Sequence, residues 1–503
     1  MVDSKQEIQR PCWDCQRRST VCDFTHPACQ RCTTKGLMCS GYGEAPPRKL
    51  KWLAPGKVSS RNRRAPTKKN GTKKNGANVK TKNQLAASPT SSSSTLPTIP
   101  ALKIRTNASA LGEAVEYYNT CIYPEVLAML ELGPNTKVHP ISPQIFARTV
   151  DRPDYLRYGF VCMALMHRSN RLQDSDPEVS ALNRTFLHFR GVMIRSLLLA
   201  INEEHVGTSN VVIAGILNLL LLEAHQSSTP EWRNHINGIQ QLMMIRGGVR
   251  AVAQAPGGEA ILPTFAHTTA LFDSTSPASD MVIATMHPDD FEFIVDEYGA
   301  RHYAFSSFPS ELFRELVNIN FLRSKAAYEP YFMPDLTAEG YRILTRIHIF
   351  VPEEWASQKS SFAEEWVLLA RINQTAMALY CLSSLQSIHV LPETAVLKNL
   401  CGTLARLLHT HLVEAMQSPR SRRSLDWYFI VLGVHSVHLG GGMREFVRTS
   451  LVTLSFSNAS RRPIAAREIL ESFWVSGRTT WDECFDKPYA LCPPWGLNVR
   501  GAT

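Results

Sequence analysis

Long apolar runs are missing from this sequence. The longest, Val211 to Leu222, is interrupted by Gly215 and Asn218, and it falls short of the ~18 apolar residues that a membrane-spanning helix requires. The first residues are largely polar and lack the apolar stretch of a secretory signal peptide. These absences predict an intracellular protein without a membrane segment, in which the cysteines stay reduced.

The motifs of several enzyme classes are missing too. We find no phosphate-binding loop, no dinucleotide-binding G-x-G-x-x-G, no H-E-x-x-H and no G-x-S-x-G. His435 and His438 are spaced one helical turn apart, but no third metal ligand lies nearby in the sequence, so ordinary packing is the favoured interpretation of this pair. We therefore expect that the protein is not an enzyme.

Acidic side chains are scarce at one end of the chain. Residues 1–83 contain 19 Lys and Arg against 5 Asp and Glu, a net charge of +14. The whole chain has a formal charge of +10, so residues 84–503 carry 10 − 14 = −4. Positive charge concentrated in this way predicts a module that binds a polyanion, attached to a body of nearly balanced charge.

Cysteine is concentrated in the same basic region. Six of the 12 cysteines follow the spacing C-x2-C-x6-C-x6-C-x2-C-x6-C, in which each half repeats C-x2-C-x6-C; they are Cys12, Cys15, Cys22, Cys29, Cys32 and Cys39. A structural zinc ion takes four ligands, so six cysteines fill two sites only if two of them bridge. The internal symmetry indicates Cys12 and Cys29 as the bridges, with Cys15 and Cys22 on one zinc ion and Cys32 and Cys39 on the other. A three-disulfide knot and a redox C-x-x-C are the disfavoured alternatives.

This segment resembles the fungal-type six-cysteine binuclear zinc cluster, the DNA-binding module of a large family of fungal transcription factors. Pro27, two residues before Cys29, stands where the family has a proline that turns the chain between the halves, and Asp23 after Cys22 is also usual. The resemblance implies two short helices, each followed by an extended strand. It also implies that the first helix is set against the major groove of double-stranded DNA.

The resemblance further implies a set of DNA-contacting side chains. The family reads a CGG triplet through positions three and four residues after the second cysteine, here Arg18 and Ser19. Arg18 has the guanidinium that makes a bidentate contact with guanine, whereas Ser19 and Val21 stand where basic residues are usual. The side chains interpreted as phosphate contacts, with solvated surface charge as the alternative, are Arg10, Arg17, Arg31 and Lys35.

A low-complexity linker follows the cysteines. Residues 46–83 interleave Lys and Arg with Gly, Asn and Pro, and residues 87–100 are rich in Ser, Thr and Pro, which predicts a disordered tether. Its basic pairs predict nuclear import or extra phosphate contacts; they are Arg63-Arg64, Lys68-Lys69 and Lys73-Lys74. The linker contains no heptad repeat, so the sequence leaves open whether the protein is a monomer or pairs through its body.

From about Leu111 onward, long segments with helical apolar periodicity predict an all-α body. The expected helices cover residues 111–131, 154–168, 178–203, 209–225, 230–246, 310–328, 362–388, 393–416, 425–438, 441–455 and 463–475. In the segment from residue 393, one buried stripe is predicted to consist of Leu397, Leu400, Leu404, Leu407 and His411. The tail with Trp474, Trp481, Phe485 and Trp495 is expected to close the helical domain, coactivator recruitment being the alternative.

One helix has clear end signals. Thr229 is its expected N-cap and Pro230 its first residue, while Gly247-Gly248 marks its end. The segment from Trp232 to Gly248 resembles a hallmark of a fungal-specific transcription factor domain, and a weaker resemblance extends over roughly residues 110–480. It implies a regulatory helical domain, in which Trp232 is interpreted as a core aromatic and His235 as a satisfied polar group.

These features together predict a mainly α protein with three parts: a zinc-cluster DNA-binding domain at 8–44, a disordered linker at 45–108 and a helical regulatory domain at 109–503. The predicted function is a nuclear, sequence-specific transcription factor acting on RNA polymerase II genes. The alternative is a zinc-dependent protein-interaction scaffold. A coactivator, a corepressor and a small-molecule inducer are all left open as partners of the body.

Overall fold

The computed structural model describes residues 12, 15, 22–25, 29–35, 39, 102, 106–132, 138–203, 209–226, 232–300, 308–328, 333–359 and 361–491. The chain divides into two compact units, Met1–Ser93 and Ser94–Thr503. In the first unit, the described residues include one short helix, α2 (Gln30–Thr33), which begins directly after Cys29. Buried cysteines, with Phe24 packed against them, form the core of this unit.

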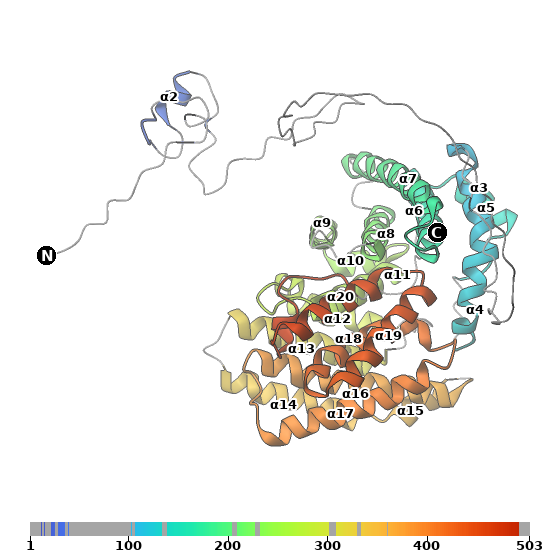
Figure 1. The fold of residues 1–503 in the computed structure, drawn as a ribbon. Helices are drawn as coiled ribbons and strands as arrows, with labels where there is room; N and C mark the ends of the chain where they lie inside the picture. Colours follow the sequence, from blue (N-terminus) through green and yellow to red (C-terminus); the bar gives the residue numbers. More distant parts are fainter. Residues whose placement is uncertain are drawn as a thin grey trace, which may run out of the picture. The chain divides into compact units, whose positions relative to one another are not determined.

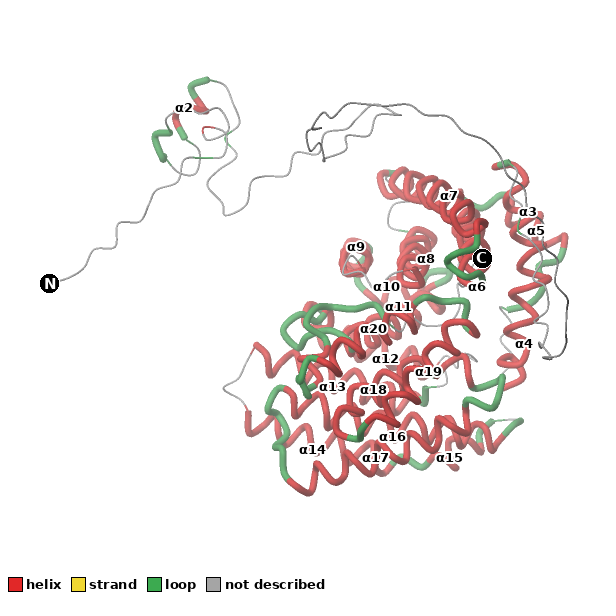
Figure 2. The backbone as a smooth tube through the Cα atoms, viewed as in Figure 1, coloured by secondary structure: helices red, strands yellow, loops and turns green. Residues whose placement is uncertain are grey.

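The second unit is helical throughout its described part, and the coloured tube of Figure 2 shows helices joined by loops and turns. The all-α prediction is confirmed for this part of the chain. Its α-helices are α3 (Asn107–Tyr117), α4 (Tyr123–Leu132), α5 (Pro143–Val150), α6 (Asp154–Arg171), α7 (Pro177–Asn202), α8 (Asn210–Gln226), α9 (Trp232–Ile245), α10 (Val249–Gln254), α11 (Gly258–Ser274), α12 (Pro288–Ala300), α13 (Ser310–Tyr328), α14 (Met333–Ile349), α15 (Pro352–Ser357), α16 (Ala363–Ser387), α17 (Ala395–Ala415), α18 (Asp426–His435), α19 (Gly441–Ser457), α20 (Arg462–Val475) and α21 (Trp481–Cys484). Short irregular helical turns occur at Tyr118–Ile122, Val282–Thr285, Arg422–Ser424 and Ser436–His438 (η5). No described helix combines the length and the apolar composition needed to cross a bilayer.

The N-terminal helices pack as a layered bundle in which α6 contacts α3, α7 and α8 (Figure 1). Helix α7 shows how the sequence sets this packing: Asp176 caps it by accepting the N–H of Glu178 at 2.8 Å, and Pro177 occupies its first position. Its buried side chains recur every three or four residues from Val179 to Ala200, so one face meets the core.

The C-terminal helices surround α16. This helix contacts α13, α14, α15, α17, α18 and α21, and most of its residues from Trp366 to Leu385 are buried. Figure 1 shows α14, α16, α17 and α15 side by side at the lower edge of the unit. The aromatic tail joins this core, because Trp474, Trp481 and Phe485 are all buried. The tail therefore closes the domain as expected, while Trp495 lies outside the described residues.

Helix α9 ends as the sequence indicates. Gly247 and Gly248 both have positive φ, and their N–H groups donate to the carbonyl oxygens of Met244 and Met243 at 3.0 and 2.8 Å. This pairing is a Schellman motif, which a glycine adopts without steric cost. Trp232 is buried, and the expected N-terminal signals Thr229 and Pro230 lie outside the described residues.

Each of the eleven expected helical segments corresponds to helix in the structure, but seven α-helices of the body were missed: α5, α10, α11, α12, α14, α15 and the short α21. Helix α11 is buried on all sides and contains Pro263, so its sequence lacks an amphipathic period and carries a helix breaker. Burial among neighbouring helices, rather than local propensity, stabilises it.

The predicted stripe on α17 is wrong in its phase. The buried face consists of Leu397, Cys401, Ala405, Leu408, Leu412 and Ala415, whereas Leu400 and Leu407 are 38% and 44% exposed. Helix α17 packs against α16, and Cys401 on its buried face lies beside Gln386 of α16. The error is therefore one of helical phase, because Leu397, Leu408 and Leu412 belong to the buried face and Leu400 and Leu407 do not.

Candidate metal centre and nucleic-acid interface

Four cysteine thiols converge in the N-terminal unit. The Sγ atom of Cys12 lies 3.6 Å from that of Cys29 and 3.9 Å from that of Cys32, and the Sγ atoms of Cys15 and Cys29 are 3.7 Å apart. The four sulfur atoms lie within 4.8 Å of one another, and all four residues are buried. The structure places none of the six cysteines of the repeat in a disulfide bond, in contrast to the disulfide-knot alternative.

The repeat in the sequence is also a repeat in three dimensions. In the first half, Cys15 donates its N–H to the sulfur of Cys12 and Cys12 donates its N–H to the sulfur of Cys22, both at 3.4 Å. In the second half, Cys32 donates to Cys29 at 3.3 Å and Cys29 donates to Cys39 at 3.5 Å. In each half, the same two backbone N–H groups thus hold the sulfur atoms of the first and third cysteines, as two equivalent metal sites require.

The electrostatics of this cluster favour a bound cation. Burial raises the pKa of the Cys12 and Cys29 thiols. The pKa of Cys32 is also raised, by its hydrogen bond with the Cys29 thiol first and by burial second. Packed thiols therefore stay protonated unless a metal ion replaces their protons. Zinc binds cysteine as the thiolate, and a set of six sulfur donors without oxygen ligands suits it.

Asp23 joins the two halves. Its Oδ1 accepts the N–H of Gln30 at 3.1 Å, its Oδ2 accepts the N–H of Arg31 at 2.8 Å, and Oδ1 also accepts the N–H of Thr25 at 3.0 Å. These bonds, with the hydroxyl of Thr25 as the largest contributor, hold the pKa of Asp23 well below its ordinary range. The carboxylate therefore fixes the start of α2 against the loop that follows Cys22.

The structure places two of the six predicted DNA-contacting residues. Arg31 lies in α2 and Lys35 just after it, and both side chains are exposed, as a phosphate contact requires. Arg10, Arg17, Arg18 and Ser19 lie outside the described residues, and so do the import candidates Arg63, Arg64, Lys68, Lys69, Lys73 and Lys74.

Two contributors to the cluster were missed at the level of sequence. Phe24 packs against the cysteines with φ at +57°, and Asp23 was noted only as usual, without its capping role. The partners of Asp23 are seven and eight residues away, so no local capping pattern shows them.

In the helical unit, His435 and His438 have ring centroids 5.2 Å apart. Among the described residues, they belong to no group of three or more metal-ligating side chains.

A binuclear thiolate module joined to an all-helical body defines a zinc-cluster transcription regulator, which is not an enzyme. Two family models match the chain: the fungal Zn(2)-Cys(6) binuclear cluster domain over residues 10–49 and the fungal specific transcription factor domain over residues 140–493. The chain belongs to this family of fungal Zn(2)-Cys(6) transcription factors, and its cluster binds two zinc ions.

Two curated proteins are similar to it. A phomenoic acid biosynthesis cluster-specific transcriptional regulator of Leptosphaeria maculans is 37% identical over 506 residues, covering 99% of this chain and 92% of the relative. Arginine metabolism regulation protein II of Saccharomyces cerevisiae is 46% identical over 44 residues, which are 9% of this chain and 4% of that protein. No solved structure matches the chain.

Proposed function

We propose that the protein is a nuclear activator or repressor of genes transcribed by RNA polymerase II, and that these genes form a biosynthetic cluster. The similarity to the regulator of phomenoic acid biosynthesis supports the second part, because it extends over almost the whole of both chains. The observation that carries the DNA-binding role is the repeated arrangement of cysteine sulfurs and backbone N–H groups in the N-terminal unit.

Within the cluster, Cys12 and Cys29 bridge the two zinc ions. Cys12 lies next to Cys32 of the second half, and Cys29 lies next to Cys15 of the first half. A bridging thiolate needs such neighbours on both sides. Cys15 and Cys22 then complete one tetrahedral site, and Cys32 and Cys39 complete the other.

The zinc cluster reads a CGG-like half-site in the major groove. Arg18 donates two hydrogen bonds to a guanine, and Ser19 accepts a looser range of bases than a lysine would at that position. Arg10, Arg17, Arg31 and Lys35 hold the module against the phosphates, and the exposed side chains of Arg31 and Lys35 support this role.

The basic linker serves two purposes in this scheme. Its pairs Arg63-Arg64, Lys68-Lys69 and Lys73-Lys74 act as the nuclear import signal, and its positive charge adds salt-dependent affinity for DNA. The proposed division of the chain is a DNA-binding domain at 8–44, a linker at 45–108 and a regulatory domain at 109–503.

Selection of random duplex DNA by the full-length, zinc-loaded protein tests this proposal. The expected result is enrichment of a CGG-like triplet, lost in Cys29→Ala and relaxed at one base in Arg18→Ala. The matched control Arg184→Ala removes an exposed arginine on α7 and should leave the selected sequence unchanged. Equal binding to all sequences would contradict specific reading.

The salt dependence separates this function from a protein-interaction scaffold. Each phosphate contact makes the slope of log K against log salt more negative by about 0.9. Replacing Arg31 and Lys35 with Gln should therefore make this slope less negative by about 2. A scaffold with an apolar partner surface would show little dependence on salt, and binding to DNA would be weak at physiological ionic strength.

A further inference from the structure

The outer face of α7 is an exposed surface that the DNA-binding function does not use. Figure 1 shows this helix along the upper edge of the helical unit, and its main contacts are with α6 and α8. Its buried side chains all lie on the side that meets the core. The opposite side carries Leu187, Leu198 and Leu199, which are 60%, 54% and 70% exposed. Several large apolar side chains gathered on one exposed face mark a site of interaction with another molecule.

The exposed side chains of α7 repeat after eleven residues. Arg184 and Leu187 recur as Arg195 and Leu198, and Gly191 lies between the two pairs. At 3.6 residues per turn, these five positions fall within about a quarter of the helix circumference, and the two arginines are about 16 Å apart along the axis. The four side chains are exposed and Gly191 is half-buried. These five residues, the α7 stripe, therefore form one straight band on the outside of the helix.

Gly191 keeps the middle of the α7 stripe open. A Cβ atom at this position would meet only Nη1 of Arg195 within 4 Å, at 3.5 Å. The distance between two packed helices depends on the size of the side chains at their contact. A second helix can therefore approach the backbone of α7 closely at Gly191, with Leu187 and Leu198 on either side of the crossing point.

The α7 stripe is positively charged, and its charge is not offset. No Asp or Glu occurs in residues 179–202. Arg190, on the flank of the helix, forms an ion pair with Glu223 of α8. Neither Arg184 nor Arg195 forms an ion pair with any residue that the structure describes. A guanidinium in this state favours a carboxylate, which it can bind through two parallel hydrogen bonds.

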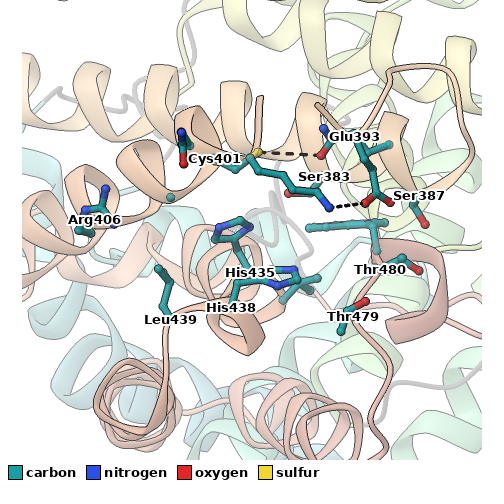
Figure 3. Close-up of a pocket in the computed structure, with 16 residues that line it drawn as sticks. Ser383, Ser387, Glu393, Cys401, Arg406, His435, His438, Leu439, Thr479 and Thr480 are labelled. Atoms are coloured by element: carbon teal, nitrogen blue, oxygen red, sulfur yellow. Dashed lines mark hydrogen bonds and ion pairs between the residues drawn. The ribbon is translucent and has the colours of Figure 1, made fainter. Parts of the chain in front are cut away.

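The polar cavity of the helical unit, with a volume of about 440 Å³, differs in this respect. It lies between α16, α17 and the end of α18, and Figure 3 shows the imidazoles of His435 and His438 within it. The Nζ of Lys398 lies 2.9 Å from Oε2 of Glu393, so these two charges offset each other inside the unit. The two arginines of the α7 stripe have no such carboxylate.

A partner that matches the α7 stripe has to present acidic and apolar side chains on the same face. Within the chain, α12 has the complementary charge, because it contains Asp289, Glu292 and Asp296 and no Lys or Arg. Its apolar side chains Phe291 and Ile294 are buried in the core, however. The α12 helix of a second copy would therefore supply the charge without the apolar contacts, so the complementary partner is a different protein.

We propose that the outer face of α7 binds an acidic amphipathic helix of a partner protein. Apolar side chains of this helix pack over Gly191 between Leu187 and Leu198, and carboxylates about three turns apart pair with Arg184 and Arg195. The surface lies in the helical unit, and its binding does not depend on which DNA sequence the zinc cluster reads.

Three synthetic peptides of about 18 residues test the chemistry on the full-length, zinc-loaded protein at physiological salt. The first has a leucine at every third or fourth position and glutamates beside these leucines. The second has lysine in place of each glutamate, and the third has serine in place of each leucine. Fluorescence anisotropy should show saturable binding of the first peptide with a Kd of about 10–100 µM, and binding of the other two should be weaker by about tenfold.

A charge reversal assigns the contact to α7. The double variant Arg184→Glu with Arg195→Glu should bind the glutamate peptide about tenfold more weakly and the lysine peptide about tenfold more tightly than the wild type does. A gain of binding to the lysine peptide cannot result from misfolding. Hydrogen exchange of residues 184–202 in the wild type should slow when the glutamate peptide is bound.

A second pair of variants separates the apolar contact from the charge. Leu187→Ser with Leu198→Ser should weaken binding of the glutamate peptide by about tenfold. The matched control Arg406→Glu with Leu407→Ser changes an exposed arginine and an exposed leucine on α17, and it should bind all three peptides as the wild type does. Unchanged far-UV circular dichroism establishes that each variant is folded.

The proposal is overturned if the charge-reversed variant binds the glutamate peptide as tightly as the wild type does, because the basic linker would then be the binding site. It is also overturned if the charge reversal dissociates a dimer of the free chain in sedimentation velocity, or if it weakens binding to DNA. A second copy or DNA would then occupy the face. Loss of DNA reading with intact peptide binding would refute only the proposed DNA function, so the two failures are distinguishable.

Discussion

Arg323 and Asp482 are 159 residues apart in the sequence and form a buried ion pair in the structure. The guanidinium of Arg323, which is fully buried, donates to both carboxylate oxygens of Asp482, at 3.2 and 3.3 Å. It also donates to the hydroxyl of Tyr380 and to the carbonyl of Ser276, each at 2.9 Å. This network attaches the C-terminal segment to α13 and α16, so residues after α20 are part of the folded domain.

Removing one partner of this pair should destabilise the helical domain. Asp482→Ala leaves the buried charge of Arg323 without its carboxylate, which costs about 3 kcal/mol in the free energy of unfolding. Glu353→Ala breaks the exposed pair of Arg371 and Glu353 and should cost less than about 1 kcal/mol. Urea unfolding followed by circular dichroism measures both, and equal effects would contradict the assignment of Asp482 to the core.

Two helical glycines should respond oppositely to replacement by alanine. A Cβ atom at Gly215 in α8 would lie 2.6 Å from Cδ2 of Tyr155 and 2.8 Å from Cδ2 of Leu197, whereas one at Gly238 in α9 meets nothing within 4 Å. Gly215→Ala should therefore lower the free energy of unfolding by about 1–3 kcal/mol, and Gly238→Ala should raise it by about 0.5–1 kcal/mol. Thermal unfolding of the two variants tests this, and a stabilised Gly215→Ala would disprove the close contact.

The stability of the helical domain should fall on mild acidification through His267. Burial lowers the pKa of this ring from 6.5 to about 4, and the ring is stacked on Phe313 with centroids 5.7 Å apart. Between these two pH values the unfolded chain binds a proton that the folded chain does not. Stability is therefore present above pH 6.5 and is lost as the pH falls towards 4, by about 3 kcal/mol for this group.

His267→Phe keeps the aromatic packing and removes the proton-binding site. Between pH 6.5 and 4, the free energy of unfolding should fall less in the variant than in the wild type. The difference between the two decreases should be about 3 kcal/mol. Urea denaturation at a series of pH values provides the comparison. Identical pH slopes for the two proteins would show that His267 is not held neutral.

Zinc removal should unfold the N-terminal unit and spare the helical one. Among its described residues, the core of the zinc module consists of cysteines and Phe24, so bound metal supplies its folding energy, whereas the helical unit has a large apolar core of its own. A chelator should abolish DNA binding while the ellipticity at 222 nm changes little. Added zinc should restore binding and magnesium should not, because magnesium prefers oxygen ligands.

The sequence alone was sufficient where the physical cause is local. Metal coordination needs only the right ligands at short spacings, so the spacing of six cysteines predicted the zinc cluster and its internal repeat. The long helices from α6 to α9 and from α16 to α20 were likewise predicted. In α7 and α9, an apolar face that recurs every three or four residues is visible in the segment itself. The terminal Gly247-Gly248 was predicted for the same reason, since only glycine adopts its backbone conformation at low cost.

Only the tertiary structure decided the features that depend on distant partners. Helix α11 is stabilised by neighbours on every side, and the buried face of α17 contains Cys401 and Ala405 in place of the predicted Leu400 and Leu407. The cavity around His435 and His438 exists because residues near 398, 435 and 479 meet there. Asp23 finds its partners across the cluster, and Arg323 finds Asp482 across the domain. Such contacts arise when the whole chain minimises exposed apolar surface and unpaired polar groups at once, which no segment does by itself.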